Sequence, residues 1–136
     1  MASDDEAIQK ERAKSAFRYT EAIAPGLNLD MSLQSILHTS TSDFQEVQVI
    51  DSFFGRTLVT DGKTQSAELD EFVYHESLVH APLFCNAILS GGGAPKSVFI
   101  GGGGELATAR EVLRHKSVER LVMVDLDPVV IEVCKK

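Results

Sequence analysis

The sequence predicts an α/β protein. A small N-terminal antiparallel β-sheet precedes the start of a doubly wound parallel unit, which is cut off after its second strand. Three observations predict this fold. Apolar and polar residues alternate over short stretches from residue 28 to 67, with the hairpin signal Asp61-Gly62 among them. A helical pattern follows over residues 70–89, and from residue 97 the order is strand, glycine-rich turn, helix, strand and helix.

The first 27 residues are predicted to be a helical extension. Residues 4–23 carry alternating charges and scattered apolar residues, and Ala24-Pro25-Gly26 would end a helix there. Residues 28–69 form the predicted β domain, whose alternation begins with Leu29, Met31 and Leu33. Later in this domain we predict a turn at Phe54-Gly55-Arg56 and a short strand over Thr57–Val59. A returning strand is predicted over Lys63–Ala67.

Residues 70–95 are predicted to be a linking helix and loop. Asp70 is an acidic helix start, and the inward positions at helical spacing are Phe72, His75 or Glu76, Val79 and Leu83. Pro82 lacks a backbone donor, so we expect it to kink or end this helix. The loop Ser90–Pro95 is the best candidate for a domain boundary.

Residues 96–136 are predicted to be the first β-α-β-α segment of the second domain. Ser97–Ile100 and Leu121–Val124 are continuous apolar strands, of the kind that is buried in a parallel sheet. Residues 105–116 predict a helix with acidic residues early and basic residues late, and Asp127-Pro128 predicts the start of another. Open sheets usually contain about four to six strands, so we expect this domain to be incomplete at residue 136.

Composition narrows the function classes. The 136 residues are 43% hydrophobic and 24% charged, which excludes a mainly disordered chain. The net charge of −7 argues against a nucleic-acid partner, and it fits either solubility or a cationic ligand. No apolar run approaches the length of a membrane span, and the N-terminus does not resemble a secretory signal. Two cysteines fit a reducing compartment, so we expect a cytoplasmic protein with no membrane partner.

The glycine-rich turn is the strongest chemical signal. Gly102-Gly103-Gly104 follows a predicted buried strand, so the backbone can approach a ligand at an electropositive helix start. Asp125 lies 23 positions after Gly102 at the tip of the next strand, where an acid can bind ribose hydroxyls. Glu105 would repel a pyrophosphate and attract a positively charged donor such as an S-adenosylmethionine derivative. Alternatively, Glu105 is a helix-start acid that contacts only water.

Two histidines on the predicted helix suggest a zinc site at first sight. Zinc-binding helices place their histidines four residues apart, whereas His75 and His80 are five apart. Five residues turn a helix by about 500°, which leaves the two imidazoles about 140° apart. We therefore predict no metal site and expect His80 to be packed or at the surface. Tyr74, taken alone, is most often a core aromatic residue.

Several blocks together resemble one family. They are Phe44–Val47, Leu58–Gln65, Glu68–Glu76, the glycine turn and Val124–Asp127. From about Leu33 to Lys136 the chain resembles the polyamine aminopropyltransferases, which comprise the spermidine, spermine and thermospermine synthases. The Gly-Gly-Gly-Glu form of the turn is closest to the thermospermine synthase group.

The resemblance implies a fold and a reaction. The fold is a small N-terminal β domain joined to a Rossmann-like catalytic domain. The reaction moves the aminopropyl group of decarboxylated S-adenosylmethionine to putrescine or spermidine and releases 5′-methylthioadenosine. The donor is a co-substrate, so no cofactor is expected. The resemblance also implies a homo-oligomer, a dimer or tetramer, built through the N-terminal sheet.

The resemblance assigns roles to particular residues. Gln45 and Gln65 would line the donor site, with Gly102 and Gly104 in the turn and His75 beside the donor. Tyr74 would assist near the reacting amine. Glu105 would hold the donor ammonium group, and Asp125 the ribose hydroxyls. The main catalytic Asp of the family lies in a later loop, so this chain alone is expected to be inactive.

The family pattern is broken at Leu106, where the family usually has glycine. This change predicts a crowded donor or a shifted helix start. The main alternative is a non-catalytic aminopropyltransferase-like subunit with a regulatory or oligomerisation role. A methyltransferase is disfavoured by the block Gln65–Glu76, and an NAD-dependent oxidoreductase by Glu105. The acceptor amine and the oligomeric state stay open.

Overall fold

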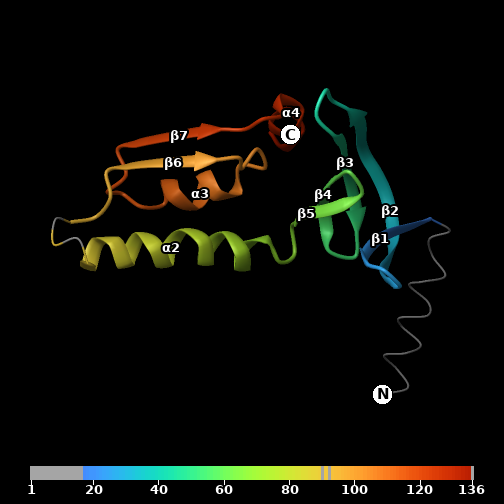
Figure 1. Cartoon of the computed structure of the whole chain (residues 1–136), viewed down its shortest axis with the longest axis horizontal. Helices are drawn as coiled ribbons and strands as arrows, with labels where there is room; N and C mark the ends of the chain where they lie inside the picture. Colours follow the sequence, from blue (N-terminus) through green and yellow to red (C-terminus); the bar gives the residue numbers. More distant parts are fainter. Residues whose placement is uncertain (1–16, 90, 92, 136) are drawn as a thin grey trace, which may run out of the picture.

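A computed structural model describes residues 17–89, 91 and 93–135. A five-stranded antiparallel sheet has the order β1-β2-β3-β4-β5, and a two-stranded parallel sheet pairs β6 with β7. Figure 1 shows the five-stranded sheet at one end of an elongated body. The long helix α2 leaves this sheet and runs beneath β6, β7 and α3, and α4 returns the chain to the five-stranded sheet. The mixed α/β fold is the one expected.

The five-stranded sheet is a set of hairpins between neighbouring strands. Its strands are β1 (Arg18–Ala24), β2 (Leu27–Thr41), β3 (Glu46–Ser52), β4 (Gly55–Thr60) and β5 (Lys63–Ala67). The predicted turn Asp61-Gly62 is confirmed: both residues have positive φ, 49° and 70°, as a tight two-residue hairpin requires. The turn predicted at Phe54-Gly55-Arg56 lies at Phe53-Phe54, so it begins one residue and ends two residues earlier than predicted, and β4 already begins at Gly55.

The helix predicted over residues 4–23 is wrong for its last part. Residues 18–24 are a strand, paired in antiparallel register with β2. A cross-strand ion pair between Arg18 and Asp30, at 2.7 Å, joins the two strands. The weak helical spacing therefore yields to long-range pairing, which a local pattern does not contain. Residues 4–16 lie outside the described part of the chain.

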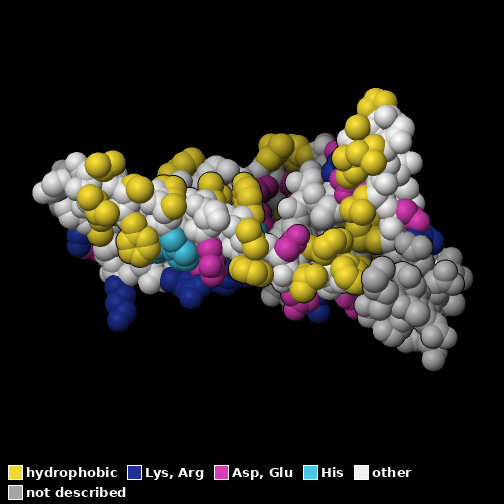
Figure 2. Space-filling view, turned by 90° about the horizontal axis from the view of Figure 1, so that it is seen from below, with side chains coloured by type: hydrophobic (Ala, Val, Ile, Leu, Met, Phe, Trp, Pro, Cys, Tyr) yellow, Lys and Arg dark blue, Asp and Glu magenta, His cyan; other side chains and the backbone are white. Residues whose placement is uncertain are grey.

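The linking helix is longer than predicted. α2 spans Glu71–Leu89 and contains Pro82, which therefore does not end it. Pro82 is exposed, so its ring sits on the solvent side of the helix. His75 and Val79 form the buried stripe of α2, whereas the predicted inward residue Phe72 is half exposed. Figure 2 shows hydrophobic side chains along the opposite, uncovered face of α2. No helix among residues 17–89, 91 and 93–135 has the length and apolarity that a membrane crossing needs.

The parallel unit consists of β6 (Ser97–Gly101), α3 (Ala107–Leu113), β7 (Arg120–Val124) and α4 (Pro128–Cys134). The two strands pair in parallel as predicted, from Ser97 opposite Arg120 onward. The prediction of burial on both faces is wrong: Ile100 packs with Val79 and Val112, but Phe99 on the other face is 68% exposed. Only one face of this sheet is covered by helices of the described chain.

The predicted helix 105–116 is wrong at both ends, since α3 begins at Ala107 and ends at Leu113. Leu106 precedes the helix with φ of 70°, in the left-handed region, and its side chain provides no cap. A residue in that conformation cannot continue a right-handed helix, so Glu105 stays in the turn. The predicted start of the last helix is confirmed, because Asp127 caps α4 and Pro128 is its first residue.

Candidate functional site

The glycine turn lies between β6 and α3 and is made of close backbone contacts. Gly102 and Gly103 have φ of 85° and 82°, a conformation that side chains disfavour. The Gly102 N–H donates to the Val124 carbonyl at 2.8 Å, which ties the turn to the end of β7. A Cβ on Gly104 would lie 2.9 Å from both Asp125 Oδ2 and Val130 Cγ1. Glycine is therefore required at position 104 for space.

Asp125 follows β7 and accepts two backbone hydrogen bonds. Its Oδ2 accepts from the Gly104 N–H at 2.7 Å, and its Oδ1 accepts from the Asp127 N–H at 2.9 Å. The structure thus brings Gly104 and Asp125 together, although 21 residues separate them. A carboxylate has about four acceptor positions, so Asp125 keeps acceptors for a ligand hydroxyl.

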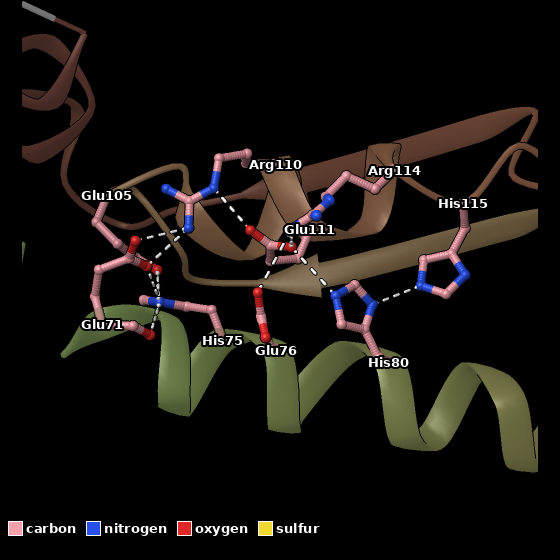
Figure 3. A network of polar contacts seen from close by, with 9 residues as sticks. All are labelled: Glu71, His75, Glu76, His80, Glu105, Arg110, Glu111, Arg114 and His115. Atoms are coloured by element: carbon pink, nitrogen blue, oxygen red, sulfur yellow. Dashed lines mark hydrogen bonds and ion pairs between the residues drawn. The ribbon is translucent and has the colours of Figure 1, made fainter.

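Glu105 contacts α2 through His75. Its Oε1 lies 3.2 Å from His75 Nε2, and His75 Nδ1 lies 2.7 Å from a carboxylate oxygen of Glu71 (Figure 3). His75 is only 3% exposed, and Arg110 of α3 donates to both oxygens of Glu71 at 2.7 and 2.9 Å. Glu105 is therefore not an acid that contacts only water. Glu105 contacts the buried imidazole of His75, whose other ring nitrogen contacts Glu71.

Gln45 reaches the same end of the parallel unit from the loop between β2 and β3. Its Nε2 donates to Asp127 Oδ2 at 2.9 Å, and the Ser42 hydroxyl donates to the same oxygen at 2.8 Å. Burial of Asp127 raises its pKa, but the hydrogen bonds from Gln45, Ser42 and the Val129 N–H outweigh it and leave the pKa below its usual value. Sequence reasoning assigned Asp127 only to the helix cap, because Ser42 and Gln45 are more than 80 residues away.

Two predicted site residues stand apart from these carboxylates. Tyr74 is 65% exposed, so the expectation of a core aromatic residue is wrong, although its ring stands edge-on to His75 at 5.1 Å. Gln65 is exposed, and its amide donates to the Lys63 carbonyl on its own strand. The roles of Tyr74 and Gln65 toward a donor stay predictions.

A second polar cluster, which sequence reasoning missed, joins α2 to α3 (Figure 3). Its centre is Glu111, which is 2% exposed and lies 2.8 Å from both Arg110 and Arg114. These guanidinium groups lower the pKa of Glu111 to about 2. The available sequence signal is the acid Glu111 between the basic residues Arg110 and Arg114. Taken alone, it predicts only a charged helix whose basic residues lie near its C-terminal end.

His80 belongs to this second cluster and not to the glycine turn. Its Nε2 lies 3.2 Å from Glu111, and its Nδ1 lies 2.8 Å from His115 Nε2. His75 and His80 therefore have separate partners, as their spacing predicts. Glu76, His80 and Glu111 each offer one possible metal-ligand atom, and these three atoms lie within 4.8 Å of one another. Arg114, however, already contacts both glutamates. The guanidinium group of Arg114 therefore supplies positive charge to the two carboxylates.

The negative charges beside the glycine turn affect the pKa of Cys134 in α4. Burial, together with the nearby charges of Glu105 and Asp125, raises the pKa of this thiol to about 11. Both carboxylates therefore lie close enough to the Cys134 thiol to act on it electrostatically. A site of this kind favours a ligand that combines a cationic group with hydroxyl groups.

Comparison with known proteins agrees with this fold. The family model described as "Spermidine synthase tetramerisation domain" matches residues 18–68, and "Spermine/spermidine synthase domain" matches residues 71–136. The chain is similar to a thermospermine synthase of Arabidopsis thaliana, with 44% identity over 119 residues, covering 87% of this chain and 33% of the relative. A polyamine aminopropyltransferase of Methanocaldococcus jannaschii is 42% identical over 119 residues, covering 87% and 39%.

Solved structures show the same arrangement. A spermidine synthase from Thermotoga maritima superposes with a TM-score of 0.81 at 34% identity, covering 90% of this chain and 41% of that one. A spermidine synthase in complex with the transition-state analogue AdoDATO also has a TM-score of 0.81 at 34% identity, covering 90% and 40%. The family models and the similar folds thus define the class of this chain, which is the aminopropyltransferase family. The chain belongs to the spermidine and spermine synthase family, and it spans about a third to two-fifths of the length of these relatives.

Proposed function

We propose that this chain forms the donor-binding part of a polyamine aminopropyltransferase. The observation that carries the proposal is the glycine turn, in which Asp125 accepts from the Gly104 N–H and Glu105 contacts His75. The donor would be decarboxylated S-adenosylmethionine, with its ribose hydroxyls on Asp125 and its ammonium group on Glu105. Gln45, Gln65 and His75 would complete this side of the site.

The proposed reaction is a displacement at carbon. The lone pair of an acceptor amine attacks the carbon bonded to the sulfonium, the carbon–sulfur bond breaks, and 5′-methylthioadenosine leaves as a neutral thioether. The new ammonium then gives one proton to a base. Because the sulfonium is already a good leaving group, the protein mainly positions the donor and keeps the amine neutral.

Tyr74 would assist this step at the amine, and the family's catalytic Asp would be the base. The resemblance puts that Asp in a loop that follows residue 136, so the 136-residue chain by itself is expected to be inactive. The acceptor would be spermidine, giving thermospermine or spermine, or putrescine, giving spermidine. The Gly-Gly-Gly-Glu turn and the Arabidopsis relative favour the thermospermine type.

The same proposal includes assembly and domain division. We infer a cytoplasmic homo-oligomer, a dimer or tetramer. Its N-terminal β domain would end near residue 69, a linking helix and loop would cover residues 70–95, and the catalytic domain would begin at residue 96. The match of residues 18–68 to a tetramerisation domain supports the assembly. The second candidate is a non-catalytic subunit of the same family. Leu106 favours it, because the family usually has glycine at this position of the turn, and the leucine is held in the left-handed region.

Calorimetric titration with 5′-methylthioadenosine tests the proposed function. We expect binding that Asp125→Ala abolishes and that Glu119→Ala leaves intact, because Glu119 lies at the opposite end of β7 and its side chain is largely exposed. Circular dichroism confirms that each variant is folded. No binding by folded protein would favour the non-catalytic subunit. Turnover by the 136-residue chain that Tyr74→Phe lowers would contradict its expected inactivity.

A further inference from the structure

Asp127 is a buried carboxylate to which the proposed reaction assigns no role. It is 1% exposed, and its Oδ1 accepts from the Val129 N–H at 2.9 Å, which caps α4. Its other oxygen accepts from Ser42 Oγ and from Gln45 Nε2, at 2.8 and 2.9 Å. One side chain thus joins a helix start to a loop of the N-terminal sheet.

Capping alone does not explain this aspartate. Serine, asparagine and aspartate cap helices about equally well, and a cap needs only one oxygen. A buried charge is costly unless several donors satisfy it. Here the second oxygen takes both of its donors from the loop between β2 and β3. The charge therefore serves the contact with the loop.

The same residue also holds the proposed ribose carboxylate. The Asp127 N–H donates to Asp125 Oδ1, and Asp125 Oδ2 accepts from the Gly104 N–H. A continuous path of hydrogen bonds thus runs from Gln45 through Asp127 and Asp125 to the glycine turn. Apolar packing runs beside it, because Val130 of α4 lies against Val47, Val49 and Leu58 of the sheet.

We propose that Asp127 is a positioning residue of the donor site, which fixes Asp125 and Gln45 relative to each other by joining the β2–β3 loop to the start of α4. The relevance to a donor rests on the proposed function, whereas the mechanical link does not. Asp127 itself needs no contact with the donor. Its effect passes through Asp125 on one side and Gln45 on the other.

Two substitutions separate positioning from capping. Asp127→Ser keeps a good cap but removes the oxygen that Ser42 and Gln45 share. Asp127→Asn keeps the cap and the length, and its amide can still pair with a reversed Gln45 amide. Asp43→Ser is the matched control, because it removes an exposed carboxylate from the same loop. A capping role predicts that both Asp127 variants equal the unmodified protein.

Two readouts are measured on the purified protein: exchange of the Gly104 amide by NMR and the affinity for 5′-methylthioadenosine. We expect Asp127→Ser to accelerate Gly104 exchange and weaken binding by about tenfold each, the size of losing hydrogen bonds to a charged group. Asp127→Asn should lie between Asp127→Ser and the unmodified protein. Asp43→Ser should change neither readout.

Unchanged Gly104 exchange in Asp127→Ser overturns the proposal, whatever happens to affinity, because Asp125 would then not depend on Asp127. Faster exchange with affinity within twofold of the unmodified protein also overturns it. If the unmodified protein does not bind 5′-methylthioadenosine, the proposed function fails, and Gly104 exchange alone decides on Asp127. If Asp127→Ser does not fold, Gly104 exchange and affinity are compared between Asp127→Asn and Asp43→Ser. Equal values in these two variants would then overturn the proposal.

Discussion

The N-terminal sheet and the parallel unit are held together in different ways. In the sheet, each strand pairs with the strand that precedes it, and the turns between them are short. In the parallel unit, β6 and β7 are separated by a helix. The hydrogen bond from Gly104 to Asp125 spans 21 residues, and the one from Ser42 to Asp127 spans 85. The polar side chains of the candidate site gather in the parallel unit. Segments distant in sequence can bring together groups that one hairpin cannot.

The two regions also use glycine differently. Gly62 in the sheet has φ of 70°, and nothing lies within 4 Å of the position that a Cβ would take, so the turn requires glycine only for its backbone angle. Gly104 in the parallel unit has no positive φ, but the space for a Cβ is already taken by Asp125 and Val130. The first is a local requirement, and the second is a tertiary one.

The largest expected effect tests this tertiary requirement. Gly104→Ala should lower the free energy of unfolding by about 2–3 kcal/mol, because its methyl group overpacks against Asp125 and Val130. Urea unfolding measures the change. Gly101→Ala is the control at the end of β6, directly before the turn, since its Cβ would make only an ordinary contact, at 3.7 Å from Phe99. Equal losses in the two variants would show that the turn, and not the contact at position 104, is sensitive.

A smaller effect is expected at the cluster between α2 and α3. The folded pKa of Glu111 is about 2, below its usual value of 4.5, so its stabilisation is present above pH 4.5 and is lost as pH falls toward 2. Glu111→Gln should cost about 1 kcal/mol near neutral pH, a value reduced by solvent screening because both arginines are more than half exposed.

Thermal unfolding across this pH range measures the effect of Glu111→Gln. The difference from the unmodified protein should shrink as pH falls from 4.5 toward 2. Glu119→Gln removes a carboxylate from an exposed ion pair with Lys96 and should leave stability nearly unchanged. A constant difference at every pH would mean that Glu111 acts through packing and not through its charge.

The smallest effect is expected to be stabilising. Leu106→Gly should raise the free energy of unfolding by about 0.5–1 kcal/mol, because glycine adopts the left-handed conformation without strain. Leu113→Gly is the contrasting control at the end of α3, where glycine should destabilise the helix. The shift of the urea midpoint measures both changes. Destabilisation by Leu106→Gly would show that the leucine side chain contributes more than its backbone costs.

Prediction from sequence worked where the signal was local. The Asp61-Gly62 turn, the apolar runs of β6 and β7, and the Asp127-Pro128 helix start are each recognised from neighbouring residues, and each element is confirmed. Prediction was wrong at residues 18–23, which form a strand only because β2 pairs with them. It was also wrong at Pro82, whose helix continues to Leu89 with the proline on the solvent side.

For the candidate site, the sequence by itself determined the residue types: the glycines of the turn, the carboxylates at positions 105 and 125, and the histidine at position 75. Only the tertiary structure decided their partners. It placed Glu105 on His75, bound Glu111 between two arginines, and joined Asp127 to Ser42 and Gln45. The physical reason is that turns and caps follow from local backbone geometry, whereas a buried charge is stable only with donors that distant segments supply.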